Sequence, residues 1–345
     1  MEVREMDDSF LRNLSCAVLL DVRSPGEYAR GHIPRAVSFP LFTDSERAEV
    51  GTLFIEKGKR AALLRGLEQV GPQMADFVRQ AETLAPQGKL AIHCWRGGMR
   101  SASLGWLLET AGFDVLGIKG GYKAYRSYIH QRFADTAWPL LVLGGETGSG
   151  KTAVLHALAK AGEQVIDLEH LARHKGSAFG SLGEEPQPTP EQFENNLYHE
   201  LCHMDSQRRI WVENESRAIG RVFQPSGFWE QFRKGIYVGM EVPYAVRLRS
   251  LAAVYGCFPK PDLIDAFLRI QKRLGGQHVQ AAIANLEAGH MEAAAAIALG
   301  YYDKSYAMSH LKCAFSRILR FIPNPEASVM EQARELIRFA DENKL

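Results

Sequence analysis

The sequence predicts an α/β protein with two mostly parallel sheets and a helical C-terminal part. Two observations predict this class. Short apolar segments alternate with helical patterns over the first two thirds of the chain, which is the order expected of parallel strands with helices on both faces. The chain has 345 residues, more than the roughly 250 to 300 at which a single core stops growing, so we expect two domains.

The first domain is expected over residues 1–135. Residues 17–21, 89–93 and 115–118 are short and apolar, as buried strands are. Residues 101–110 have a helical pattern and lie between two of these strands. The alternation predicts one parallel sheet, with its functional side chains at the carboxyl ends of the strands.

The second domain is expected over residues 136–345. The apolar run 140–143 leads directly into a glycine-rich loop and then into a helix over residues 151–161. From about residue 260 onward the pattern is helical, so a helical region should pack on or beside the second sheet. Further strands of this sheet are expected at residues 164–167, 209–213 and 236–240.

Composition and charge exclude several classes of protein. The net charge is +1, from 41 basic and 40 acidic residues, so any RNA-binding surface must be local. No apolar stretch approaches the roughly 20 residues that span a bilayer, and the start of the chain lacks signal-peptide features, so we expect a cytoplasmic protein without membrane contact. Four of the five cysteines lie in apolar or helical surroundings and are expected to be buried and inert: Cys16, Cys202, Cys257 and Cys313.

The fifth cysteine, Cys94, has different neighbours. It follows an apolar strand and precedes a helix, where free amide groups stabilise an anion. Gly97 and Gly98 allow the backbone to curl inward, and Arg96 and Arg100 add positive charge. These conditions lower a thiol pKa and produce a nucleophile near neutral pH, so the sequence predicts a reactive cysteine in an anion-binding loop.

This loop, taken with Asp21-Val22-Arg23 and Gly31-His32-Ile33-Pro34, resembles the rhodanese family of sulfurtransferases over roughly residues 10 to 133. The resemblance implies a cysteine that carries a persulfide, while the two upstream motifs are mainly structural. The Cys94 to Arg100 spacing, C-x5-R, is one residue longer than the usual sulfurtransferase loop and is similar to that of rhodanese-related phosphatases. A phosphatase therefore stays an alternative for this domain in isolation.

A second anion-binding motif follows the strand at 140–143. Its pattern is G-x-x-x-x-G-K-[ST], and a strand before it and a helix after it are the context that this motif requires. The amides are expected to hold a phosphate chain, Lys151 to offset its charge, and the Thr152 hydroxyl to offer a ligand for Mg²⁺. The phosphate- or diphosphate-binding residues expected here are Gly145, Gly148, Ser149, Gly150, Lys151 and Thr152.

Several charged residues nearby are candidates for support. Glu213 ends an apolar strand, as a metal-binding acid would, although whether a metal is needed stays open. Asp167 ends another strand. It could contact substrate or cap the helix that follows, and the cap is the preferred interpretation. Other candidates are Glu215 and Arg217, beside Glu213, and His174 and Lys175, for phosphate or RNA contact. Tyrosines interleaved with cations in the C-terminal part could stack bases, or belong to a packed helix: Tyr301, Tyr302, Tyr306, Lys312, Arg317 and Arg320.

The order of the two motifs, with Val212-Glu213-Asn214-Glu215-Ser216-Arg217 and Tyr301-Tyr302-Asp303 downstream, resembles the bacterial tRNA 2-selenouridine synthases over nearly the whole length. The resemblance implies a transferase that replaces the sulfur of wobble 2-thiouridine by selenium, through an S-geranyl intermediate. Its implied substrates are geranyl diphosphate, selenophosphate and tRNAs of the Lys, Glu and Gln type. No tightly bound cofactor is implied, Mg²⁺ stays open, and an enzyme that supplies selenophosphate is an implied partner.

Within that resemblance, Cys94 is expected to attack selenophosphate and retain selenium as a selanylsulfide, with Arg96 and Arg100 holding the anion. The phosphate loop is expected to hold the diphosphate of geranyl diphosphate. Two other classes remain as alternatives: an ATP-dependent sulfurtransferase or kinase, and a binding module without catalysis, which the intact Cys94 loop disfavours.

Overall fold

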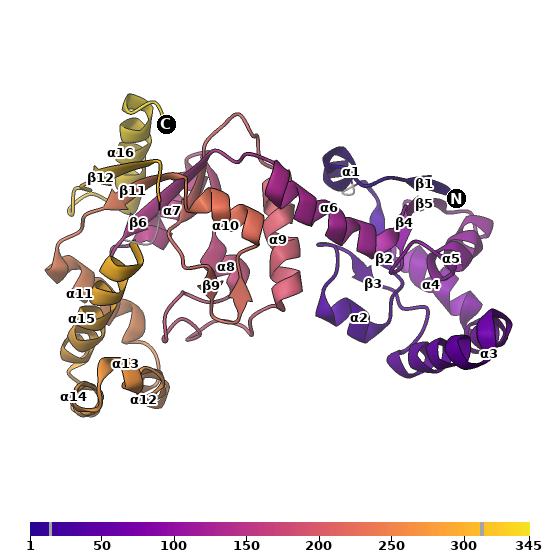
Figure 1. Cartoon of the computed structure of the whole chain (residues 1–345), viewed down its shortest axis with the longest axis horizontal. Coiled ribbons are helices and arrows are strands. Elements are labelled where there is room, and N and C mark those ends of the chain that lie inside the picture. The colour runs from indigo at the N-terminus through magenta and orange to yellow at the C-terminus, as the bar shows by residue number, and fades with distance from the viewer. Residues whose placement is uncertain (14–15, 311–313) are drawn as a thin grey trace. The chain divides into compact units, whose positions relative to one another are not determined.

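The computed structural model describes residues 1–13, 16–310 and 314–345 (Figure 1). The chain divides into two compact units, of which the first is Met1–Phe133 with Glu194–His203 and the second is Ala134–Phe193 with Met204–Leu345. Helix α9 (Pro190–Cys202) therefore begins in the second unit and ends in the first. The division expected from the sequence, at residue 135, does not include this return of residues 194–203 to the first unit.

The first unit contains a five-stranded sheet of order β1-β5-β4-β2-β3, in which every pair of neighbours is parallel. Its strands are β1 (Glu2–Arg4), β2 (Val18–Asp21), β3 (Val37–Ser38), β4 (Lys89–His93) and β5 (Asp114–Ile118). Its helices are α1 (Asp8–Asn13), α2 (Pro25–Arg30), α3 (Asp44–Val70), α4 (Met74–Leu84), α5 (Met99–Thr110) and α6 (Gly121–Asp135), with a 3₁₀ turn at Gly71–Gln73.

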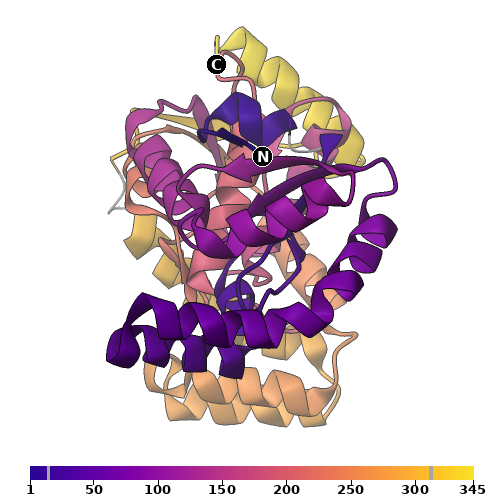
Figure 2. The same cartoon turned by 90° about the vertical axis from the view of Figure 1, so that its right-hand side faces the viewer.

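Burial explains why these segments form the first sheet. The apolar residues of β2 and β4 are buried except for the partly buried Val18. Leu20, Leu90 and Ile92 pack with Phe39, Phe77 and Leu104 in one core. Strands buried on both faces read as continuous apolar runs, which is why the sequence indicated them. The long helix α3, dark purple in Figure 2, is interrupted at Gly58, whose φ of 81° lies in the left-handed region that glycine tolerates.

The second unit contains a parallel sheet of order β12-β11-β6-β8-β7 and a small antiparallel pair, β9 with β10. The strands are β6 (Leu140–Gly145), β7 (Gln164–Ile166), β8 (Ile210–Glu213), β9 (Ala218–Ile219), β10 (Val222–Phe223), β11 (Ile236–Met240) and β12 (Arg317–Phe321). Besides α9, the helices are α7 (Lys151–Lys160), α8 (Leu168–Ala172), α10 (Ser226–Phe232), α11 (Tyr244–Tyr255), α12 (Lys260–Arg269), α13 (Gln271–Leu274), α14 (Gly276–Glu287), α15 (Met291–His310) and α16 (Val329–Glu342).

The expected α/β class with parallel sheets and a helical C-terminal part is confirmed, with one correction. Residues Arg317–Phe321 were expected within a helical region, but they form edge strand β12, parallel to β11. The segment is short and mixes two arginines with three apolar residues, so its pattern did not distinguish a basic helix from an edge strand with one face in solvent.

The cysteines also require a correction. Cys202 is buried as expected, but Cys16 and Cys257 are exposed. Each lies beside apolar residues in sequence, and sequence neighbours do not fix which side of an element meets solvent. Cys313 and Lys312 lie outside the described residues. Among the described helices, none is long and apolar enough to cross a membrane.

Candidate functional site

Cys94 lies immediately after β4 and before α5, at the carboxyl edge of the first sheet. The loop between them requires glycine. Gly97 has a φ of 62°, and a Cβ there would lie 2.6 Å from the carbonyl oxygen of Ile118. At Gly121 a Cβ would lie 2.3 Å from the carbonyl oxygen of Cys94. The loop therefore packs against the start of α6 at distances that no larger residue permits.

The thiol of Cys94 is surrounded by hydrogen-bond donors. The amide of Gly98 donates to Sγ at 3.2 Å, and the hydroxyl of Ser101 donates to it at 3.3 Å. Burial raises the pKa of Cys94, but the Ser101 hydroxyl and the amides of Ser101, Arg96 and Gly98 lower it by more. The pKa of the thiol is therefore below its ordinary value, which favours a thiolate nucleophile.

The two arginines of the loop have different surroundings. Arg96 is exposed. Arg100 is partly buried, and its Nη1 lies 2.7 Å from Oε2 of Glu27. The charge of Arg100 is thus partly neutralised by the Glu27 carboxylate before any anion binds in the loop. Ser101 was not among the candidates from the sequence, although its position two residues into the helix that follows the loop is where an N-terminal hydroxyl can turn back to an anion.

A buried ion pair lies at the end of β2, beside the strand β4 that precedes Cys94. Arg23 and Asp21 are 1% and 0% exposed, and Arg23 Nη2 lies 2.6 Å from Asp21 Oδ2. The same nitrogen donates to the carbonyl of Gly31 at 2.6 Å, and the guanidinium lies over the ring of Tyr122. Burial lowers the pKa of His93, which keeps this neighbour of Cys94 neutral. This geometry fits a structural role for the upstream motif residues.

The phosphate loop connects β6 to α7, as the motif requires. Gly148 and Gly150 have φ values of 81° and 80°, so both adopt left-handed backbone that glycine tolerates. The Nζ of Lys151 donates to the carbonyl of Gly145 at 2.6 Å. A cavity of about 760 Å³ opens over the loop, and all six phosphate-binding candidates lie on its wall.

Three glutamates meet beside Lys151 and Thr152. The Thr152 hydroxyl donates to Glu169 at 3.1 Å, and the Glu169 amide donates to Glu213 at 2.7 Å. Burial, followed by repulsion from Asp167, raises the pKa of Glu213 well above its ordinary value. Burial, followed by the charge of Glu169, raises the pKa of Glu215 to about 8. Glu169 was not among the candidates from the sequence, because Asp167, two residues earlier, was selected as the acid at the end of the strand.

The other support candidates are divided by the structure. Asp167 caps α8 by accepting from the His170 amide at 2.8 Å, which confirms the preferred interpretation. Lys175 and Arg217 lie on the cavity wall, with Lys175 3.0 Å from Glu184. His174 is not among the residues that line this cavity, and its ring packs instead against Gly180.

The tyrosines of α15 lie at the phosphate loop. Tyr301, Tyr302 and Tyr306 line the cavity, and the Gly145 amide donates to the Tyr306 hydroxyl at 2.8 Å. Arg247 of α11, which the sequence did not single out, was missed because its partners lie far away in sequence. It is almost fully buried and lies 2.9 Å both from Glu146 in the loop and from Asp303 in α15. Arg317 and Arg320, on β12, do not lie on the wall of this cavity.

A narrow apolar pocket adjoins the cavity over the phosphate loop. It measures about 40 Å³, and its wall is formed mainly by α11, α12, α14 and α15. Phe179, Leu263, Phe267 and Leu286 are buried residues of this wall. The pocket and the cavity share five wall residues: Thr147, Ser177, Leu251, Tyr255 and Tyr302. An apolar space thus begins at the edge of the cavity over the phosphate loop.

Comparisons with known proteins agree with this arrangement. Residues 6–128 match the family described as rhodanese-like domain, and residues 138–321 match that described as tRNA 2-selenouridine synthase AAA domain. These matches confirm the expected order of the two domain types. A protein of Bdellovibrio bacteriovorus named tRNA 2-selenouridine synthase is 35% identical, over 83% of this chain and 84% of its own.

Two further similarities were found. A protein of the same name from Nitrosomonas europaea is 35% identical over 72% of this chain and 66% of its own. A crystal structure of the N-terminal domain of a protein from Clostridium difficile 630 is 38% identical and covers 37% of this chain and 98% of its own, with a TM-score of 0.35.

Proposed function

Because this chain belongs to the tRNA 2-selenouridine synthase family, we propose that it converts 2-thiouridine at the wobble position of tRNA to 2-selenouridine. The reaction has two steps, an S-geranylation that uses geranyl diphosphate and a selenation that uses selenophosphate. The phosphate loop of the second unit serves the first step, and Cys94 serves the second. The substrates are tRNAs of the Lys, Glu and Gln type that carry 2-thiouridine.

The observation that carries the geranylation step is the apolar pocket beside the phosphate loop. A prenyl diphosphate needs a phosphate site that is continuous with an apolar one. The shared wall at Thr147, Leu251 and Tyr302 provides that continuity. The loop amides and Lys151 would hold the diphosphate, and the geranyl chain would widen the pocket as it enters between α11 and α15, because about 40 Å³ is less than a ten-carbon chain fills.

The step balances without a redox partner. The 2-thio sulfur attacks C1 of geranyl diphosphate, the C1–O bond breaks, and pyrophosphate leaves with the electron pair. The uridine then loses its N3 proton to solvent. Donors fixed where this negative charge develops lower the barrier, and Lys151 with the amides of Gly148 and Gly150 is such a set.

Magnesium fits beside the departing diphosphate. Oxygen ligands are what Mg²⁺ prefers, and the Thr152 hydroxyl and Glu169 carboxylate lie together on the cavity wall. Oε2 of Glu213 is buried and has no hydrogen-bond partner among the described residues, so a nearby cation would compensate it. Mg²⁺ bound there would offset charge on the leaving pyrophosphate.

In the selenation step Cys94 is the nucleophile toward selenophosphate, and electron balance distinguishes two routes. If the thiolate attacks selenium and forms a selanylsulfide, phosphorus leaves as phosphite. If it attacks phosphorus, an S-phosphocysteine forms and selenide is released without any redox change. Selenide then attacks C2 of the base, geranylthiolate leaves, and water hydrolyses the phosphocysteine to phosphate. The C-x5-R length of the loop favours attack on phosphorus.

The test uses the full chain with a 2-thiouridine tRNA. Geranyl diphosphate and selenophosphate are added separately and together, and the nucleosides are analysed by mass spectrometry after digestion. We expect S-geranyl-2-thiouridine with geranyl diphosphate alone and 2-selenouridine only with both. A requirement for ATP in either step would reject this function in favour of an ATP-dependent sulfurtransferase.

Two variants assign the steps to the two sites. Cys94→Ser should abolish selenation and leave geranylation intact, whereas Lys151→Ala should abolish geranylation. Cys257→Ser, at an exposed cysteine of the second unit, is the matched control and should retain both activities. Retained 2-selenouridine formation by Cys94→Ser would reject the role of that thiol. Phosphate or phosphite in the products distinguishes attack on phosphorus from attack on selenium.

A further inference from the structure

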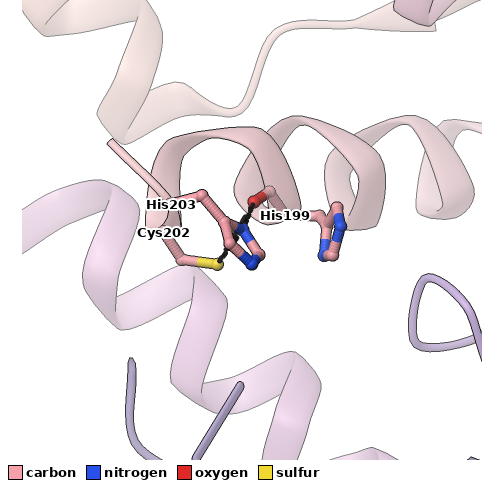
Figure 3. Close-up of side chains that lie close together, drawn as sticks. All are labelled: His199, Cys202 and His203. Carbon is pink, nitrogen blue, oxygen red and sulfur yellow. Dashed lines mark hydrogen bonds between the residues drawn. The ribbon is translucent and has the colours of Figure 1, made fainter. Parts of the chain in front are cut away.

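Three side chains of types that can bind metal lie together where α9 ends, in the first unit: His199 and Cys202 in the helix and His203 directly after it. His199, Cys202 and His203 have the spacing i, i+3 and i+4, which brings them to one side of a helix. Figure 3 shows the two imidazole rings and the thiol along the same side of the last turns. The proposed reaction uses none of the three.

The distances suit a single metal ion. One ligand atom from each residue lies within 4.8 Å of those from the other two. Sγ of Cys202 is 3.3 Å from Nδ1 of His203, and tetrahedral zinc with Zn–N and Zn–S bonds of about 2.0 and 2.3 Å sets such a pair about 3.5 Å apart. The His203 ring is exposed, so it can rotate to close the remaining gap.

The ligand types select the metal. Two imidazoles and one thiolate form a borderline-soft set, which favours Zn²⁺ over the hard ions Mg²⁺ and Ca²⁺. Cys202 is 3% exposed, so its sulfur is largely withdrawn from solvent, while His203 is exposed and gives an ion a path of entry. The Cys202 thiol and Nδ1 of His203 both hydrogen-bond to the carbonyl of His199, at 3.2 and 2.7 Å, and metal binding replaces these two bonds.

The cluster also borders a cavity of about 400 Å³, which gives a bound ion an open side. The cavity wall includes Val18 and Lys89, the first residues of β2 and β4. Cys94 follows the last residue of β4, so the cluster lies at the opposite end of the sheet from the reactive thiol. An ion here would not touch the atoms that react at Cys94.

We propose that His199, Cys202 and His203 bind one Zn²⁺ ion, with the fourth position open to this cavity and filled by water. Binding replaces the thiol proton of Cys202, which is released to solvent, and no electron is transferred. Arg12 donates to the carbonyl of Cys202, and the Tyr198 hydroxyl donates to Asp8, so α1 is already attached to this turn of α9. The ion therefore stabilises the packing of the end of α9 within the first unit.

The experiment measures zinc affinity of the full chain by competition with a chromophoric chelator. We expect one zinc per chain, and an affinity at least about 100-fold weaker in Cys202→Ser, since even the partners of metal ligands contribute about 10- to 100-fold. Added zinc should raise the thermal midpoint of the wild-type chain and leave that of His203→Ala unchanged. His203 is exposed, so its replacement tests the site without opening the core.

Cobalt provides a direct readout of the thiolate. The Co²⁺-loaded chain should show a sulfur-to-metal charge-transfer absorption that is lost in Cys202→Ser and retained in the control Cys257→Ser. The proposal is overturned if Cys202→Ser and His203→Ala bind zinc as tightly as the wild-type chain, or if the absorption survives in Cys202→Ser. Circular dichroism of each variant confirms that a lost signal is not a lost fold.

Discussion

Removing the Ser101 hydroxyl should raise the pKa of Cys94. In the structure this hydroxyl lies 3.3 Å from Sγ and 3.2 Å from the carbonyl oxygen of Gly98. It has one proton, so it can donate to only one of the two at a time. Beside a thiolate it turns to sulfur, and beside a thiol it can turn to the carbonyl. Ser101→Ala therefore removes a donor that matters most to the charged form.

The size of the effect follows from the hydrogen bond. A hydrogen bond to a charged group contributes about 1.5 to 3 kcal/mol. The bond to the Gly98 carbonyl, given up when the hydroxyl turns to sulfur, offsets about 1 kcal/mol of this. A net loss near 1.4 kcal/mol corresponds to about one pKa unit. Below both pKa values, the thiolate fraction should fall about tenfold. The alkylation rate should fall less, because a thiolate of higher pKa is the stronger nucleophile.

The assay is alkylation of the full chain by iodoacetamide from pH 5 to 10, followed by peptide mass spectrometry at Cys94. The midpoint of the wild-type profile should lie below the ordinary pKa of a cysteine thiol, since the pKa of Cys94 is lowered. Ser101→Ala should move the midpoint upward by about one unit, with the amides still in place. Ser103→Ala is the matched control, because its hydroxyl donates to the Arg100 carbonyl on the same helix. Coincident profiles for Ser101→Ala and the wild type would refute the reasoning.

Three further outcomes are expected. The raised pKa of Glu215, about 8, means that the folded chain binds an extra proton between about pH 4.5 and 8, so stability falls as pH rises. Glu215→Gln should reduce that slope by up to about 1.4 kcal/mol per pH unit in urea titrations, and an unchanged slope would contradict the assignment. Ala295→Phe should fill the apolar pocket and raise the KM for geranyl diphosphate at least about tenfold. Ala296 is not on the pocket wall, so Ala296→Phe should leave this KM unchanged. Equal KM values for the two variants would reject the pocket as the geranyl site. Asp21→Asn should lower the free energy of unfolding by about 3 to 5 kcal/mol, because it leaves a buried arginine unpaired, whereas Asp76→Asn at an exposed pair should cost less than about 1 kcal/mol; equal losses in denaturant titrations would show that burial does not matter here.

The positions and backbone turns of the Cys94 loop and the phosphate loop could be predicted from the sequence, because each depends only on neighbouring residues. The strand before Cys94 and the helix after it fix where its sulfur lies, and the glycines at 97 and 98 fix how the backbone turns. The same holds for Gly145 to Thr152. A strand, a glycine turn and a helix over a dozen residues need no distant contact to be recognised. The Asp167 cap is equally local, since its acceptor and the His170 amide are three residues apart.

The rest of the candidate site could not be predicted because its residues meet across long sequence separations. Tyr306 reaches the Gly145 amide over 161 residues, and Arg247 reaches Asp303 over 56. No pattern in either segment reports the other. The apolar pocket likewise needs the relative placement of four helices, which no local pattern reports.

The sequence by itself determined the fold class, the order of the two domain types and the positions of the Cys94 loop and the phosphate loop. Strand periodicity and glycine spacing are properties of neighbouring residues, so they can be read along the chain. Only the tertiary structure decided that Ser101 faces Sγ, that Glu169 joins Thr152, that β12 adds an edge strand and that α9 ends in the first unit. Each of these contacts depends on which apolar surfaces are buried against one another, and that is determined only when the whole chain packs.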